Sequence, residues 1–232
     1  MSQRAVVNQP GKRVPRIGRP RQDRGIRSRA AILAAAERLF AGSGVDGTRI
    51  EAIAAEAGVN KALLYYYFKS KDALYEAVLE NHAREFYQRA VAVLNSKEKA
   101  SNVVLAYVGM SFDFIAARPH FPALIQRLSM SGGRPFEHLA RKYSAPLAER
   151  LTEVIERGIH TGEFRRVDPE HTVVSLAALT RFYFAVAPIV RAVTGSDPYE
   201  ADNVRRRRHE VLEFVRYGLF RNPEAYSLCA SC

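Results

Sequence analysis

Cysteine is scarce in this chain of 232 residues, which contains only two, Cys229 and Cys232. They stand in the terminal sequence SLCASC, a spacing that can form a redox couple or half of a zinc site. Structural zinc usually takes four ligands, and no matching Cys or His pair lies nearby. We therefore predict a flexible tail at 223–232 and expect neither a metal nor another cofactor.

Long apolar runs are also lacking. The nearest approach to a membrane-spanning run, 173–190, is interrupted by Thr180 and Arg181. The sequence has no apolar stretch of the kind found in a secretory signal. We therefore expect a cytoplasmic protein that has no membrane partner.

Catalytic motifs are missing as well. The six histidines are scattered along the chain, without a His-Glu-x-x-His motif, a nucleophile elbow or a phosphate-binding loop. These absences count against a zinc protease, an esterase or a nucleotide-dependent enzyme. We predict a protein without catalytic activity.

Positive charge is what the sequence has in excess, with a net charge of +11 at pH 7. Residues 1–30 hold nine Lys or Arg against one acid, Asp23. Residues 1–26 form an N-terminal arm rich in Pro, Gly, Gln and Arg. This composition predicts that the arm is disordered, and its positive charge predicts an anionic partner. Its GRPR stretch resembles the core of an AT-hook, so Arg19 and Arg21 are candidates for the minor groove of DNA. A nonspecific basic tail is the alternative.

Alternating strand patterns are missing, whereas helical periodicity recurs along the chain. We predict an all-α fold: a three-helix helix-turn-helix DNA-binding domain at 27–75, followed by a helical ligand-binding and dimerisation domain at 76–222. The segment SGGRP at 131–135 is expected to be a loop, and Pro188 is expected to kink the eighth helix. The expected helices, about nine in number, are 27–41, 48–57, 60–68, 71–94, 102–117, 119–130, 136–160, 169–193 and 199–220.

The segment 48–71 carries the most specific pattern. Thr48-x-x-Glu51 is typical of a capping box, in which the hydroxyl accepts from the Glu51 amide and the carboxylate reaches back. Gly58 can take the left-handed conformation that ends one helix and allows a tight turn to the next. Two short helices joined in this way form a helix-turn-helix.

The third predicted helix contains three consecutive tyrosines in KALLYYYF. At i, i+4 spacing, Leu64 and Phe68 form one apolar stripe that can seat this helix on the first two. The other three stripes pair Lys61 with Tyr65, Ala62 with Tyr66 and Leu63 with Tyr67. These stripes then face outward or sideways. Tyrosine hydroxyls can donate to phosphates, and lysine can reach guanine acceptors. The alternative is that the tyrosines are ordinary packing residues.

Residues 27–80 closely resemble the TetR family of transcriptional regulators, most specifically in IEAIAAEAGVNKALLYYYFKSKDALYEAVL. Family members often carry a small polar residue where Leu63 stands, so we expect an apolar base contact there. Many carry histidine where Tyr67 stands. We expect Tyr67 to keep the phosphate contact without the pH sensitivity of a histidine. The resemblance implies these positions at or near DNA: Thr48, Arg49, Asn60, Lys61, Ala62, Leu63, Tyr65, Tyr66, Tyr67 and Lys71.

The C-terminal part carries two apolar helices, 169–193 and 199–220. The resemblance implies that they form a four-helix dimer contact with a second copy; the alternative is that they only complete the monomer core. Arginines 205–208 splay around the last helix, which indicates solvated positions or intersubunit salt bridges rather than DNA contacts. The resemblance also implies a ligand pocket, whose candidate lining residues are Tyr107, Met110, Phe114, Phe121, Gln126, Met130, Arg181, Phe182 and Tyr183.

Together these features predict a homodimeric, ligand-responsive repressor that binds a palindromic operator in double-stranded DNA and is released by a small-molecule effector. A TetR-like activator, or a regulator without a small-molecule ligand, is the nearest alternative. A basic membrane-surface protein is a more distant one, because it leaves the helix-turn-helix unexplained.

Overall fold

The computed structural model describes residues 20–225, with side chains from residue 24 onward. The all-α prediction is confirmed, because these residues form no β-strand beyond one isolated bridge between Phe164 and Phe220. The pair Cys229 and Cys232 lies outside the described residues. The elements are α1 (Pro20–Gly47), α2 (Ile50–Glu56), α3 (Lys61–Phe68), α4 (Lys71–Leu94), α5 (Ala100–Ala116), α6 (Phe121–Ser131), α7 (Gly133–Leu139), the π-helix η1 (Ala140–Ser144), α8 (Ala145–His160), α9 (Pro169–Ala185), α10 (Ala187–Thr194), α11 (Ala201–Leu219) and the 3₁₀-helix η2 (Pro223–Ala225).

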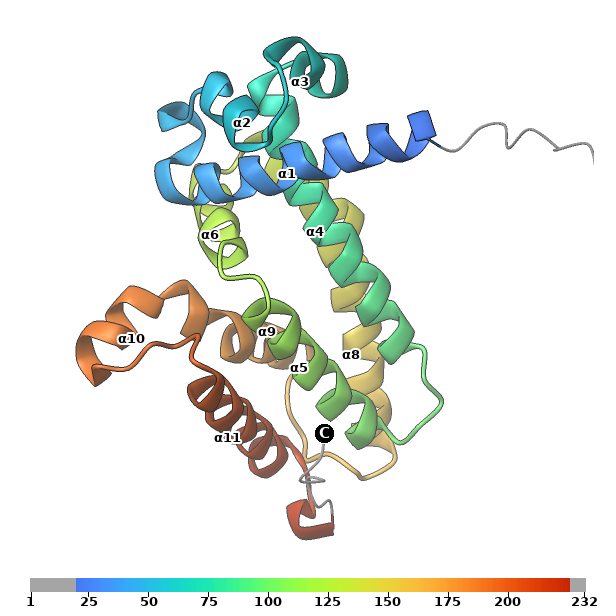
Figure 1. Cartoon of the computed structure of the whole chain (residues 1–232). Coiled ribbons are helices and arrows are strands. Elements are labelled where there is room, and N and C mark those ends of the chain that lie inside the picture. The colour runs from blue at the N-terminus through green and yellow to red at the C-terminus, as the bar shows by residue number, and fades with distance from the viewer. Residues whose placement is uncertain (1–19, 226–232) are drawn as a thin grey trace, which may run out of the picture.

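The first three helices form a head at one end of the molecule, with α1 running crosswise beneath α2 and α3 (Figure 1). Helix α1 begins at Pro20 rather than near Arg27, so it includes the last residues that we assigned to the arm. It is interrupted at Gly44, whose φ of 72° and ψ of 177° suit a residue without a side chain. The helix that we predicted to end near Ala41 therefore kinks at Gly44 and continues to Gly47.

Helix α4 descends from the head beside α8, and α5 lies in the body against α4, α8, α9 and α11 (Figure 1). The buried apolar side chains form one cluster in the head and another in the body. The head cluster includes Leu124 and Leu128 of α6, so its core extends beyond the domain boundary that we predicted after residue 75. Helix α4 contributes to both clusters, with Leu74 in the head and Leu94 in the body.

The predicted helix at 136–160 is longer and less regular than expected. The loop predicted at 131–135 is reduced to a break at Gly132, after which α7 begins. The chain then passes through the π-helical turn η1 before α8. Pro146, near the start of α8, has no N–H to donate, so the regular hydrogen-bond ladder cannot continue through this point.

The predicted helix at 169–193 starts as expected but divides in two. Asp168 caps it by accepting from the His171 N–H at 2.9 Å. At Val186 the chain bends by 66° between α9 and α10. Pro188 lies in the first turn of α10, where a missing N–H is tolerated. The kink predicted from Pro188 is confirmed, and it separates two helices.

The described part of the chain contains neither a single membrane-spanning helix nor a cluster of metal-binding side chains. No single helix there has both the length and the apolar character needed to cross a bilayer. Two bent pairs, α5 with α6 at 98° and α9 with α10 at 66°, meet these criteria by length and composition when each pair is taken together. Residues 24–225 bring together no group of three His, Cys, Asp or Glu side chains that could hold a metal ion.

Candidate nucleic-acid interface

The turn between α2 and α3 is closed by backbone hydrogen bonds and a side-chain cap. Gly58 has a φ of 65°, the left-handed conformation that the sequence predicts. The Val59 N–H donates to the Ala54 carbonyl at 3.0 Å. Asn60 Oδ1 accepts from the Leu63 N–H at 2.7 Å, which satisfies a free donor in the first turn of α3. These bonds fix α3 against α2 at the outer end of the head.

Helix α3 has one buried side and one exposed side. Leu64 is fully buried and Phe68 is 4% exposed, as predicted. Tyr65 and Tyr66, by contrast, are 39% and 70% exposed, and Ala62 beside them is exposed too. The alternative that these tyrosines are ordinary packing residues is therefore wrong for Tyr65 and Tyr66.

An ion pair links the first turns of α2 and α3. Lys61 Nζ lies 2.5 Å from Glu51 Oε1 and 5.9 Å from the centre of the Tyr65 ring. The hydrogen bond from Lys61 lowers the pKa of the Glu51 carboxyl, and the same bond raises the pKa of Lys61. Both groups therefore remain charged at neutral pH, on an exposed surface.

The capping box predicted at the start of α2 is wrong. Arg49, which is exposed, occupies the N-cap position, and no side chain caps this helix. The Thr48 hydroxyl instead donates to the Gly44 carbonyl at 2.6 Å and to the Leu39 carbonyl at 3.2 Å. Thr48 is only 4% exposed. It holds α2 on the kinked end of α1 and does not face outward as a DNA contact.

Two more residues that we predicted to contact DNA are partly buried in the head. Tyr67 is half-buried, and its hydroxyl donates to the Gly25 carbonyl of α1 at 3.2 Å. Lys71 is half-buried, and its ammonium donates to the Thr48 carbonyl at 3.3 Å. The outward-facing tyrosine hydroxyls that we predicted at three positions are thus reduced to two, because the third braces α1 against α3.

Sequence reasoning missed Lys69, the residue that ends α3. It is exposed, its φ is 55°, and its ammonium lies 5.9 Å from the centre of the Tyr66 ring. A positive φ is uncommon for a residue with a side chain. The spacing of three residues from Tyr66 could have suggested that the two side chains meet.

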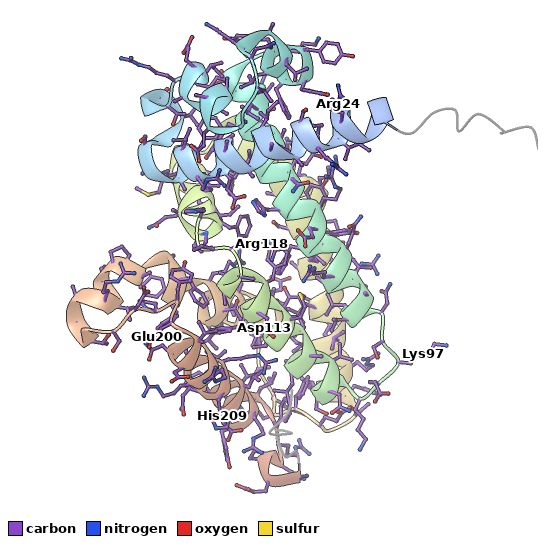
Figure 2. The ribbon with its side chains drawn as sticks, viewed as in Figure 1. Arg24, Lys97, Asp113, Arg118, Glu200 and His209 are labelled. Atoms are coloured by element: carbon purple, nitrogen blue, oxygen red, sulfur yellow. The ribbon has the colours of Figure 1, made fainter. Side chains whose placement is uncertain are left out.

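The N-terminal part of α1 adds further cations to this end of the molecule. Arg24 and Arg27 are exposed, and Figure 2 shows Arg24 on the stretch of α1 that projects past the head. The guanidinium of Arg29 lies 5.2 Å from the centre of the Phe68 ring. Of the two predicted minor-groove residues, Arg19 lies outside the described residues, and Arg21 belongs to α1 with its side chain outside them.

The predicted ligand-binding residues do not meet around one cavity. Phe114 and Phe121 belong to the body core, at 1% and 8% exposed, with Tyr107 and Met110 packed against it. Met130 is 82% exposed and Gln126 is exposed. Arg181 and Phe182 are exposed on α9, and Phe182 and Tyr183 line an outer groove between α9, α10 and α11. The structure therefore divides this set into a core group and a surface group.

Two family models match the chain. Residues 32–78 match the model described as "Bacterial regulatory proteins, tetR family". Residues 102–215 match "Tetracyclin repressor-like, C-terminal domain". The first segment covers most of the head, and the second covers most of the body.

Two characterised relatives are similar over most of this chain. The HTH-type transcriptional regulator RutR of Escherichia coli K12 is 32% identical over 180 residues, which cover 74% of this chain and 84% of RutR. The HTH-type transcriptional repressor NicS of Pseudomonas putida is 31% identical over 164 residues, or 68% of this chain and 76% of NicS.

Solved structures share the arrangement of head and body. The ketosteroid transcriptional regulator KstR2 of Mycobacterium tuberculosis superimposes with a TM-score of 0.69 at 19% identity, over 83% of this chain and 95% of KstR2. At that identity the likeness concerns the fold alone. The family models and the relatives carry the assignment further: the chain belongs to the TetR family of bacterial regulatory proteins and is a helix-turn-helix, DNA-binding transcriptional regulator.

Proposed function

We propose that this regulator is a repressor that binds a palindromic operator as a homodimer and leaves it when a small-molecule effector binds. The observation that carries the proposal is the division of α3. Its inner side is core, whereas Lys61, Tyr65 and Tyr66 are exposed together on its outer side.

The outer side of α3 suits the major groove of DNA. A recognition helix places its first residues against base edges, which here are Lys61 and Ala62. The hydroxyls of Tyr65 and Tyr66 can then donate to backbone phosphates, which fix the register of the protein on the duplex. Arg49 and Lys69, both exposed, add cations whose phosphate contacts make binding weaken with salt.

A second copy would cover an apolar face on α9, α10 and α11. Phe182 of α9 and Phe214 of α11 line one groove on this face. Large exposed apolar patches mark interaction sites, and two-fold pairing would set two heads on two half-sites. The large apolar side chains that are more than half exposed here are Val174, Phe182, Ile189, Val193, Phe214 and Tyr217.

The effector is proposed to bind in the body and to change the position of the head. Helix α4 packs in both cores, so a change in the body core has a direct path to α3. Among the predicted lining residues, Tyr107 has its pKa raised by burial and would offer a neutral hydroxyl to a ligand. One structurally similar regulator, from Saccharomonospora viridis, is known in complex with choline, which supports a small-molecule site in this fold.

Selection of bound fragments from genomic DNA tests the proposal. The expected result is a palindrome whose half-site centres lie roughly 10 base pairs, or a multiple of this, apart. Deleting the gene should raise transcription beside that palindrome, whereas a fall would identify an activator. Binding without preference for any palindrome over random duplex would contradict the proposal. A DNA target also implies a cytoplasmic protein that needs neither a membrane nor a catalytic site.

A further inference from the structure

The ion pair between α2 and α3 combines an acid and a base on the surface proposed to meet DNA. The Glu51 side chain is 62% exposed and that of Lys61 is 52% exposed. An exposed pair of this kind contributes little to stability, because water solvates both charges and salt screens them. Stability alone therefore does not explain why a carboxylate lies beside the first residue of α3.

The ion pair holds the Glu51 carboxylate beside the Lys61 ammonium, so a duplex that meets one group also meets the other. Glu51 Oε1 lies 2.5 Å from Lys61 Nζ, so both groups reach the same point of a groove. A carboxylate near phosphates is repelled by their negative charge, and a hydrogen bond accepted from the DNA offsets that repulsion. Base edges in the major groove offer such donors, and the amino group of cytosine is a usual partner for glutamate.

A G·C base pair matches this arrangement of charges. Guanine presents two acceptors in the major groove, N7 and O6, and its cytosine presents the N4 amino donor beside them. An ammonium can donate to O6 or N7 while a neighbouring carboxylate accepts from N4. In an A·T pair the donor lies between two acceptors and the thymine methyl occupies the edge, which gives a poorer match.

We propose that Glu51 is a specificity-determining residue, and that Lys61 and Glu51 together read one G·C base pair in each half-site of the operator. This inference rests on the proposed function, because it requires α3 to lie in the major groove. In the proposed complex, the ion pair of the free protein persists, and Lys61 and Glu51 each gain a hydrogen bond to a base.

The chain supplies a matched control on the same helix. Glu56, also on α2, pairs with Arg38 of α1 at 2.6 Å rather than with α3. Its side chain is 32% exposed, and that of Arg38 is 48% exposed. Glu51→Ala and Glu56→Ala each remove one negative charge from α2, so they change the net charge of the protein alike. A change in base preference is expected for the first variant alone.

The experiment selects duplexes from a randomised pool with the wild-type protein and with both variants, and confirms by thermal unfolding that each is folded. The wild type should select G·C at one symmetric position, and Glu51→Ala should lose roughly tenfold discrimination there, while Glu56→Ala keeps it. Glu51→Gln, which retains an acceptor without the charge, should lose part of this discrimination. N4-methylcytosine at the selected position should weaken the wild type and leave Glu51→Ala unaffected.

The outcomes separate this inference from the proposed function. If the wild type and Glu51→Ala select the same palindrome with equal stringency, or if A·T is selected at the Glu51-dependent position, the base-pair assignment is overturned and the repressor proposal stands. An equal loss of discrimination in both alanine variants also overturns it. If the wild type selects no palindrome, both fail together.

Discussion

The Nε2 atom of His82 lies 3.0 Å from the Glu37 carboxylate, where α4 packs against α1. Both side chains are largely buried, at 9% and 20% exposed. The imidazole ring also lies against the ring of Phe121 in α6, with 4.9 Å between centres. One polar pair and one aromatic contact thus join three helices at the junction of the head with the body.

The Glu37–His82 pair should make stability depend on pH. Burial raises the pKa of Glu37, but the hydrogen bond and charge of His82, with the charges of His120 and Arg118, outweigh it and leave the pKa lowered. A carboxyl whose folded pKa lies below its unfolded value stabilises the protein above roughly pH 4.3, and this stability is lost as the pH falls through the folded pKa. Glu37→Gln should therefore flatten the fall in Tm between about pH 5 and 3, measured by circular dichroism.

His82→Ala is the companion variant, because it removes both the hydrogen bond and the charge of His82, the two causes that most lower the pKa of Glu37. It should flatten the same part of the profile. An unchanged slope in Glu37→Gln would show that other groups account for the acid sensitivity.

Thr48→Val should destabilise the head without removing a DNA contact. Valine keeps the shape of threonine but leaves the Gly44 and Leu39 carbonyls without the hydroxyl that donates to them. The expected loss is about 1–2 kcal/mol in the free energy of unfolding, measured in urea. Thr172→Val is the control, since that hydroxyl donates to the Asp168 carbonyl in an exposed setting. Weaker DNA binding at unchanged stability would return Thr48 to the interface.

Tyr66→Phe should weaken DNA binding and leave folding intact. The ring is 70% exposed, so removal of its hydroxyl should alter stability by less than about 0.5 kcal/mol. A lost hydrogen bond to a phosphate should reduce affinity roughly tenfold at fixed salt, measured by fluorescence anisotropy. Tyr199→Phe, whose hydroxyl donates to the Pro119 carbonyl in the body, should bind like the wild type. Equal affinity of wild type and Tyr66→Phe would remove this phosphate contact.

Phe214→Glu should give a monomer that binds a palindrome weakly. The side chain is 66% exposed on α11, and a carboxylate there would be buried without a partner in the proposed dimer. Light scattering should show half the wild-type mass. Met130→Glu, on α6 and 82% exposed, is the control that should stay dimeric. A dimeric Phe214→Glu protein would place the interface elsewhere.

The fold was largely predictable because its helices carry local start and stop signals. Asn60, Ser70 and Asp168 cap their helices, as residues of these types commonly do, and the left-handed turn predicted at Gly58 is confirmed. The π-helical turn was not predicted, because the effect of Pro146 depends on how the preceding helix is packed.

The interface was predictable where one helix decides the outcome and not where two helices meet. Periodicity within α3 correctly placed Leu64 and Phe68 inside and Tyr66 outside. It could not show that the Thr48 hydroxyl turns back to α1, or that Tyr67 donates to Gly25, because these partners are distant in sequence. Such contacts arise from the packing of α1 under the motif.

Helix α4 has the geometry of a lever. Its 24 residues, Lys71–Leu94, give it a length of about 36 Å. A tilt of about 5° around the lower end would displace the upper end by about 3 Å, close to the 3.4 Å step between successive nucleotides of one DNA strand. A disturbance in the body core too small to change any helix could thus carry α3 out of register with its base pairs.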